Sequence, residues 1–281
     1  MPIDQPLAGQ VALVTGAGRG FGRAIAERLT AAGAAVALVA RSQGQLDEVA
    51  AAIAAGGGRA LAIAADVAVR AEVELAVRQT VDRLGPVDLL VNNAGLGGPY
   101  GPIGAVDVEA WWRAQSVHVR GPLLFMSAVI PAMAARRAGR IVNVASLGAF
   151  QVTPNMSAYG VGKAAQVRLT EHVAAERRDE GIVAFAIEPG TVFTDLAEST
   201  IADPDAQRWA PGAVAFLQEL KAAGADPGPG LARCADFVAA LASGRYDELT
   251  GRYLDAEDDL DELLAEARAG APPRGPRRIE H

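Results

Sequence analysis

The sequence has few of the residues that bind metals or form covalent cross-links. Its 281 residues include a single cysteine, Cys234, so neither an intrachain disulfide nor a thiolate metal cluster can form. The three histidines stand far apart, at positions 118, 172 and 281, and match no zinc-binding spacing. These absences exclude a disulfide-stabilised scaffold and give no support for a metal site.

Long apolar runs and excess positive charge are also lacking. No uninterrupted apolar run reaches 18 residues, and the first residues do not combine a basic segment with an apolar one. We therefore expect neither a membrane span nor a signal peptide, and a cytoplasmic location. The formal net charge of −7 disfavours binding to nucleic acid, which needs a basic face. The 51% hydrophobic content is that of a globular protein.

Short β-branched runs alternate with longer alanine-rich stretches such as 23–33 and 45–57. The runs are almost continuously apolar, which is typical of strands buried on both faces of a parallel sheet. The alternation predicts an α/β fold in which residues 1–281 form one domain, a Rossmann-type doubly wound sheet of about seven strands. The expected strands are 11–15, 35–40, 60–65, 87–92, 139–146, 182–190 and 251–256.

The alternation stops at segment 195–230, which is rich in proline, glycine and charge. We expect an irregular substrate lid with one helical piece in the middle. Its large apolar side chains could cover a bulky, apolar substrate or could equally pack the lid onto its own domain; they are Leu196, Ile201, Trp209, Phe216 and Leu217. The end of the chain, 271–281, is rich in proline and arginine, and we expect it to be mobile.

A glycine-rich loop, TGAGRGFG, joins the first expected strand to the first helix at residues 15–22. Gly16, Gly20 and Gly22 permit a tight turn and a close approach of the backbone to a pyrophosphate at the helix N-terminus. The spacing TGxxxGxG resembles the short-chain dehydrogenase/reductase family. Arg19 and Phe21 of the same loop are then expected to contact the nucleotide.

Further motifs follow in the order of that family. Asn92–Gly95 reads NNAG, Tyr159–Lys163 matches YxxxK, and Pro189–Thr194 matches PGxVxT. The resemblance covers residues 8–194 closely and 231–256 more loosely. It implies a nicotinamide cofactor held by residues of these motifs and by the end of the third strand: Asp66, Val67, Asn93, Ala94, Gly95, Tyr159, Lys163, Pro189, Gly190, Val192 and Thr194.

The YxxxK motif suits acid–base chemistry because Tyr159 and Lys163, four residues apart, share one helix face. A nearby ammonium and an oxidised nicotinamide favour the phenolate, so we expect a lowered pKa for Tyr159. The tyrosine can then exchange a proton with the oxygen of a carbonyl or alcohol. Ser146, 13 residues earlier, is expected to hydrogen-bond the same oxygen.

The choice of cofactor depends on the end of the second strand. Dinucleotide-binding proteins that prefer NAD usually carry an acidic residue there. This chain has Ala40, followed by Arg41 and Ser42. Since an arginine matches a 2′-phosphate and Arg19 adds a second charge, we favour NADP(H) over NAD(H).

His118 departs from the family pattern. In the stretch WWRAQSVHVRGP, residues 111–122, it stands where the family has an asparagine that completes a tetrad with Ser, Tyr and Lys and holds a water linked to the lysine. The imidazole can donate, accept and titrate near neutrality, so it could replace the asparagine as a catalytic residue. Alternatively, the residue type at this position could be unimportant, in a slower enzyme of the same type. The histidine could also mark a site that binds nucleotide but does not carry out simple ketone reduction.

These features predict an oxidoreductase that interconverts a ketone or aldehyde and an alcohol by hydride transfer. The alternatives on the same fold are a non-redox lyase or isomerase and a nucleotide-binding regulatory protein. The partner would be a small carbonyl or alcohol compound. The resemblance also implies a homodimer or homotetramer.

Overall fold

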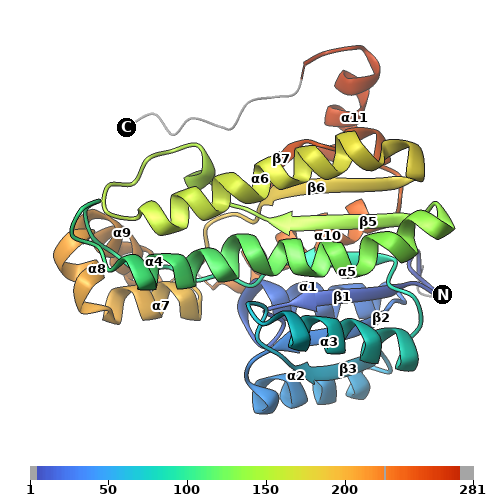
Figure 1. Cartoon of the computed structure of the whole chain (residues 1–281), viewed down its shortest axis with the longest axis horizontal. Helices are drawn as coiled ribbons and strands as arrows, with labels where there is room; N and C mark the ends of the chain where they lie inside the picture. The colour runs from blue at the N-terminus through green and yellow to red at the C-terminus, as the bar shows by residue number, and fades with distance from the viewer. Residues whose placement is uncertain (1–4, 225, 273–281) are drawn as a thin grey trace.

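Seven parallel strands form a single sheet in the order β3-β2-β1-β4-β5-β6-β7 (Figure 1). The computed structural model describes residues 5–224 and 226–272, so most of the expected mobile end lies outside the described residues. The sheet confirms the predicted Rossmann-type fold. Its strands are β1 (Val11–Thr15), β2 (Ala35–Ala40), β3 (Arg59–Ala64), β4 (Leu89–Asn92), β5 (Gly139–Val144), β6 (Ile182–Glu188) and β7 (Tyr253–Asp255).

Helices bury both faces of the sheet, which explains why the strands are mostly apolar. One core contains Val14, Leu38 and Phe185 of the sheet under α1, α2, α10 and α11. The other contains Leu13 and Leu90 under α3, α5 and α6. These helices are α1 (Gly20–Ala31), α2 (Gln43–Ala55), α3 (Arg70–Arg83), α5 (Gly121–Arg136), α6 (Ser157–Arg177), α10 (Gly228–Ala242) and α11 (Leu260–Arg268).

The direction of strand order changes between β1 and β4, which both pair with their neighbours in parallel register. Ligands of open α/β sheets bind in the crevice outside the carboxyl ends of the strands at such a switch point. The loops that follow β1 and β4 are the glycine-rich loop and the NNAG stretch. The topology therefore brings the two motifs to one edge of the sheet.

The described part of segment 195–230 is mostly helical, and the prediction of an irregular lid with one helical piece was wrong. It forms α7 (Asp195–Ala202), α8 (Pro204–Trp209) and α9 (Pro211–Ala222) before α10 begins at Gly228. Pro204 and Pro211 are the first residues of α8 and α9, where the missing N–H costs nothing, and Asp203 caps α8 through the N–H groups of Asp205 and Ala206. Figure 1 shows the three helices together beyond the carboxyl ends of the strands, beside α4.

A π turn, η1 (Ser116–Arg120), separates α4 (Val108–Gln115) from α5, and His118 lies within it. The combined helical stretch Val108–Arg136 is long and apolar enough to cross a membrane by length and composition, although it contains no uninterrupted apolar run of 18 residues. Core helices pass the same test, and Phe125, Met126 and Met133 of α5 are packed in the second core.

Candidate active site

The glycine-rich loop after β1 forms the first wall of the site. Gly16 has φ +65°, a conformation that favours glycine. A Cβ atom on Gly22 would lie 2.2 Å from the carbonyl oxygen of Gly16, so α1 can approach the loop this closely only with glycine there. The N-cap residue of α1, Arg19, makes no side-chain capping bond to the first-turn N–H groups. The loop therefore fits a pyrophosphate at the N-terminus of α1.

The NNAG loop is fastened to the glycine-rich loop through Thr15, a contact that sequence analysis did not predict. The N–H groups of Asn93 and Ala94 donate to Thr15 Oγ1 at 3.0 Å and 3.1 Å. Asn93 Nδ2 donates to the carbonyl oxygen of Thr15 at 2.9 Å. The side chain of Asn93 thus joins the two loops of the expected cofactor crevice.

The residues expected at the ribose end follow β2 and β3. Arg41 is exposed, and Ser42 caps α2 by accepting from the N–H of Gln45. Asp66 turns back on its own loop, because its Oδ1 accepts from the N–H of Ala68 at 2.9 Å; Val67, next to it, is buried. Arg19 is exposed and forms a long ion pair with Asp195 of α7, at 3.8 Å. Both arginines are available to an anion at this edge.

The PGTVFT stretch after β6 reaches back to the glycine-rich loop. Gly190 has φ +86°, and Pro189 directly follows the last residue of β6, which explains why the strand ends earlier than expected. The side chain of Thr194 lies about 3.8 Å from the position that a Cβ atom on Gly20 would occupy. The stretch therefore lies beside the glycine-rich loop, and its contact with a nucleotide stays a prediction.

Ser146 and Tyr159 meet at the carboxyl end of β5. Ser146 follows β5 and Tyr159 lies in the first turn of α6, and their side chains are hydrogen-bonded. Burial raises the pKa of the Tyr159 phenol to about 12, and the hydrogen bond with Ser146 opposes this only in part. The expected lowering of this pKa, which counted on the Lys163 ammonium together with an oxidised nicotinamide, is not produced by the protein side chains, because desolvation of the phenolate is the largest effect.

Lys163 lies one turn further along α6 and is only 4% exposed. Its Nζ lies 5.7 Å from the centre of the Tyr159 ring and donates to the carbonyl oxygen of Val144 at 2.6 Å and to Gln166 Oε1 at 3.2 Å. Burial lowers the pKa of Lys163 to about 8, and the negative charge of Glu188 opposes this shift. The lysine is thus a fixed cation beneath the tyrosine at neutral pH.

His118 is fully buried against this group of side chains. Its Nε2 lies 3.0 Å from the carbonyl oxygen of Leu96, and its ring meets that of Tyr159 edge to face. Nδ1 is buried with no hydrogen-bond partner among the described residues. Burial, and then the charge of Lys163, lower the pKa of His118 to about 3. The expectation that this imidazole titrates near neutrality is therefore wrong, since the protonated form cannot be solvated there.

Glu188, the last residue of β6, is a further member of the site that sequence analysis missed. Its carboxylate accepts from the N–H of Leu147, the residue after Ser146, and from the hydroxyl of Tyr253 at 3.1 Å. Burial raises the pKa of this carboxyl group. The position before PG in AIEPG was its only signal in the sequence.

Comparisons with known proteins agree with this geometry. The family model for short chain dehydrogenases matches residues 10–205. The chain belongs to the short-chain dehydrogenase/reductase family. It is 36% identical over 268 residues to a short chain dehydrogenase of Pseudocercospora fijiensis, covering 93% of this chain and 84% of that protein.

Two solved structures resemble this dehydrogenase. Levodione reductase has a TM-score of 0.77 at 31% identity, over 89% of this chain and 96% of that chain. A putative NAD(P)-dependent gluconate 5-dehydrogenase from Beutenbergia cavernae, with bound NADP, has a TM-score of 0.76 at 32% identity, over 92% and 98%. The chain is thus an oxidoreductase that acts on a small molecule.

The segment predicted to be a lid is anchored to the loop after β4. Tyr100 Oη and Thr200 Oγ1 of α7 are 2.8 Å apart, and both residues are buried. Tyr100 also packs with Ala206, Ala210 and Val214 in a small separate core, against which Trp209 lies. Trp209 therefore packs the lid onto the domain, while Phe216 is 54% exposed. Packing onto the domain is thus seen for Trp209, and the role of Phe216 in covering a substrate stays a prediction.

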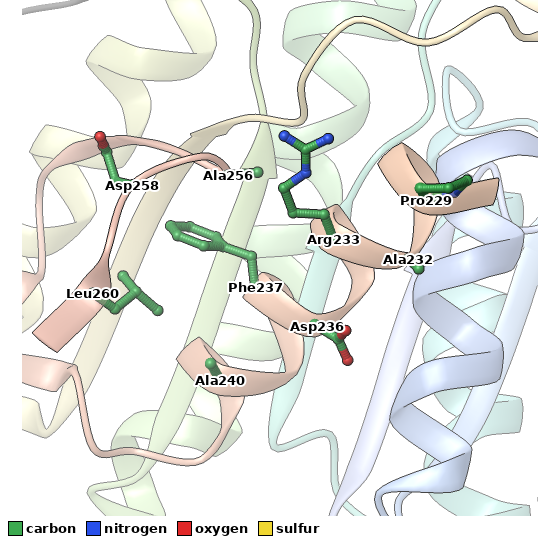
Figure 2. A pocket seen from close by; sticks show the side chains of 9 residues that line it. All are labelled: Pro229, Ala232, Arg233, Asp236, Phe237, Ala240, Ala256, Asp258 and Leu260. Carbon is green, nitrogen blue, oxygen red and sulfur yellow. The ribbon is translucent and has the colours of Figure 1, made fainter. Parts of the chain in front are cut away.

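A shallow pocket lies away from this site, between α10 and the loop from β7 to α11 (Figure 2). None of the predicted catalytic or cofactor-binding residues lines it. Arg233 and Phe237 project from α10 toward it, and Asp258 and Leu260 border it on the other side. Its remaining lining residues are Pro229, Ala232, Asp236, Ala240 and Ala256.

Proposed function

We propose that this dehydrogenase interconverts a ketone or aldehyde and an alcohol, with NADP(H) as the hydride carrier and Tyr159 as the general acid or base. The observation that carries the proposal is the assembled group of Ser146, hydrogen-bonded to Tyr159, with the Lys163 ammonium 5.7 Å from the tyrosine ring. Ser146 follows β5, and Tyr159 and Lys163 lie on α6, so the three side chains come from the carboxyl end of β5 and from the helix beside it.

The protein residues handle the proton and the charge on oxygen. With a pKa near 12, Tyr159 is protonated at neutral pH and can donate its proton to a carbonyl oxygen, while Ser146 hydrogen-bonds the same oxygen. The nicotinamide, when bound, supplies the hydride that the carbonyl carbon receives. The buried Lys163 cation stabilises the phenolate that remains, so the arrangement favours reduction at neutral pH.

NADP(H) is supported by two exposed arginines at the ribose edge, Arg19 and Arg41. Neither β2 nor the loop after it offers a carboxylate to the 2′-hydroxyl: the stretch reads Ala40, Arg41, Ser42. Two of the similar structures contain NADP, among them a metagenomic short-chain oxidoreductase at 31% identity.

The substrate is proposed to be bulky and apolar. Exposed apolar side chains stand on two loops and one helix beyond the carboxyl ends of the strands: Ile103 after β4, Phe150 and Val152 after β5, and Phe216 on α9. A homodimer or homotetramer is supported by other exposed apolar residues on the helices that carry the motifs, namely Val108, Trp112, Leu123 and Val161.

The decisive experiment follows consumption of NADPH and of NADH across a panel of bulky ketones, for the wild type beside His118→Asn. We expect turnover with NADPH and no gain in the variant, because the buried, neutral imidazole already holds the π turn to Leu96. A wild type that binds NADPH without turnover, and a variant that reduces ketones, would instead favour the non-redox or regulatory role.

A further inference from the structure

Gln166 connects Lys163 to the π turn through its side-chain amide. It lies on α6, fully buried, about one turn after Lys163. Its Oε1 accepts from Lys163 Nζ at 3.2 Å, and its Nε2 donates to the carbonyl oxygen of His118 at 2.9 Å. Both ends of the amide are therefore engaged, one by a site residue and one by the backbone of η1.

The position of Gln166 is itself fixed by a buried polar chain that begins in the sheet. Thr170 Oγ1 donates to the carbonyl oxygen of Gln166 at 2.9 Å and accepts from Asn143 Nδ2 of β5 at 2.8 Å. Asn143 Oδ1 accepts in turn from Asn92 Nδ2 of β4 at 2.9 Å. Asn92 Oδ1, at the far end, has no partner among the described residues, but the links from Asn92 Nδ2 to Gln166 are all made and hold the glutamine in one arrangement.

The ammonium group of Lys163 has three N–H donors. Val144 and Gln166 accept from it, and no further acceptor is found in residues 5–224 and 226–272. One N–H thus remains for whatever binds in the crevice. Without Gln166 a second donor would be left in a buried place, where an unsatisfied charged donor is costly.

We propose that Gln166 is a positioning residue of this enzyme: its amide ties the Lys163 ammonium to the backbone of His118 and leaves one N–H of the ammonium for the site. This tether, the two hydrogen bonds of the Gln166 amide, is inferred from the geometry of those bonds alone, whereas its consequence for catalysis rests on the proposed function. Because an amide carries no charge, it orients the lysine and favours its charged form without adding a carboxylate beneath Tyr159.

Few titratable groups face Lys163. They are Tyr159 on the same helix, His118 from η1 and Glu188 from β6. His118 is neutral above pH 4 and Tyr159 below pH 11, since their pKa values are about 3 and about 12. Glu188 is therefore the group whose charge acts on the ammonium near neutrality, and none of the substitutions that test the tether changes this glutamate.

The chain has only two lysines, Lys163 and Lys221, which permits a direct test. In protein labelled with carbon-13 at the lysine ε position, two resonances can be titrated by NMR, and Lys221→Arg assigns them. Lys221 is exposed and paired with Glu198, so its resonance is an internal reference. The variants are Gln166→Glu, Gln166→Met and, as a matched control, Gln115→Met. Gln115 is another buried glutamine that donates to a backbone carbonyl, that of Ala158, but does not contact Lys163.

We expect the midpoint of Lys163, near pH 8 in the wild type, to rise in Gln166→Glu by about one unit or more, because a carboxylate then faces the ammonium. It should fall in Gln166→Met, which removes the acceptor, and stay unchanged in Gln115→Met. The alkaline limb of ketone reduction should move in the same directions. The tether would be overturned if the titration midpoint of Lys163 were unchanged in both Gln166 variants, or if Gln115→Met shifted it by as much. If the NMR shifts occur and no ketone is reduced by any variant, the tether holds and the proposed function fails.

Discussion

The rings of His118 and Tyr159 meet edge to face, with their centroids 5.7 Å apart and their planes at 88°. The contact joins the π turn to the first turn of α6, and Gly162 allows it because a Cβ atom there would lie 2.6 Å from His118 Cβ. The histidine therefore supports the tyrosine by packing, and its backbone carbonyl supports Lys163 through Gln166. Both effects are independent of its protonation.

Acid should destabilise the protein through His118. Its pKa is about 3 in the fold and near 6.5 when unfolded, so the unfolded chain binds the additional proton between these values. The free energy of unfolding should fall by up to about 1.4 kcal/mol per pH unit as the pH decreases below 6.5. Urea unfolding at pH 7, 5.5 and 4.5 measures this slope.

The matched controls for that slope are His118→Asn, which should reduce it, and His172→Asn, which should not. His172 is exposed and lies beside Glu176. An equal acid slope in wild type and His118→Asn would show that the buried imidazole is protonated in the fold.

Tyr159→Phe should abolish proton transfer while preserving the ring contact with His118. We expect kcat for ketone reduction to fall about 10²–10⁴-fold, the usual contribution of general acid catalysis, with nucleotide affinity changed little. Steady-state kinetics and the quenching of protein fluorescence by NADPH measure the two quantities. If this variant kept its turnover, Tyr159 would not be the general acid.

Arg41→Ala should weaken the binding of NADPH but not that of NADH. The loss of a charge-assisted contact to the 2′-phosphate corresponds to about a tenfold to hundredfold rise in KM for NADPH, with KM for NADH unchanged. Arg168→Ala, an exposed arginine on the outside of α6, is the control and should change neither value. Equal effects on both cofactors would argue that Arg41 does not discriminate between them.

Gly162→Ala should disturb the site through packing. The added methyl group would overlap His118, which forces α6 or the π turn to shift and costs about 1–3 kcal/mol of stability. Ketone reduction should fall with it, because Tyr159 and Lys163 are on the displaced helix. Gly212→Ala in α9, where a Cβ atom meets nothing within 4 Å, should leave Tm and activity intact.

The sheet and the motif residues were predictable because each depends on local sequence. Val11–Thr15 is buried at every position and therefore reads as an uninterrupted apolar run, and the glycines after it mark the turn that the backbone requires. Ser146, Tyr159 and Lys163 stand at spacings that place them together once the sheet forms.

The remaining features depend on contacts between distant segments. Gln166 looks like any polar residue of a helix until α6 packs on η1, and Glu188 gains its partners only when β6 lies beside β5 and β7. The pKa values of His118 and Tyr159 are set by burial, which spacing does not reveal. The lid was misjudged because a segment rich in proline, glycine and charge is typical of an irregular loop, whereas Pro204 and Pro211 both begin helices.

The π turn at 116–120 also sets the phase of the helices on either side of it. Such a turn holds one residue more than α-helical winding allows, so deleting a single residue there would restore regular winding and rotate α4 relative to α5 by about 100°. Trp111, which donates to Ser157 from α4, would then face another direction. The orientation of α4 beside the lid is thus determined by the length of the chain in η1, and a one-residue deletion there would be more damaging than most substitutions.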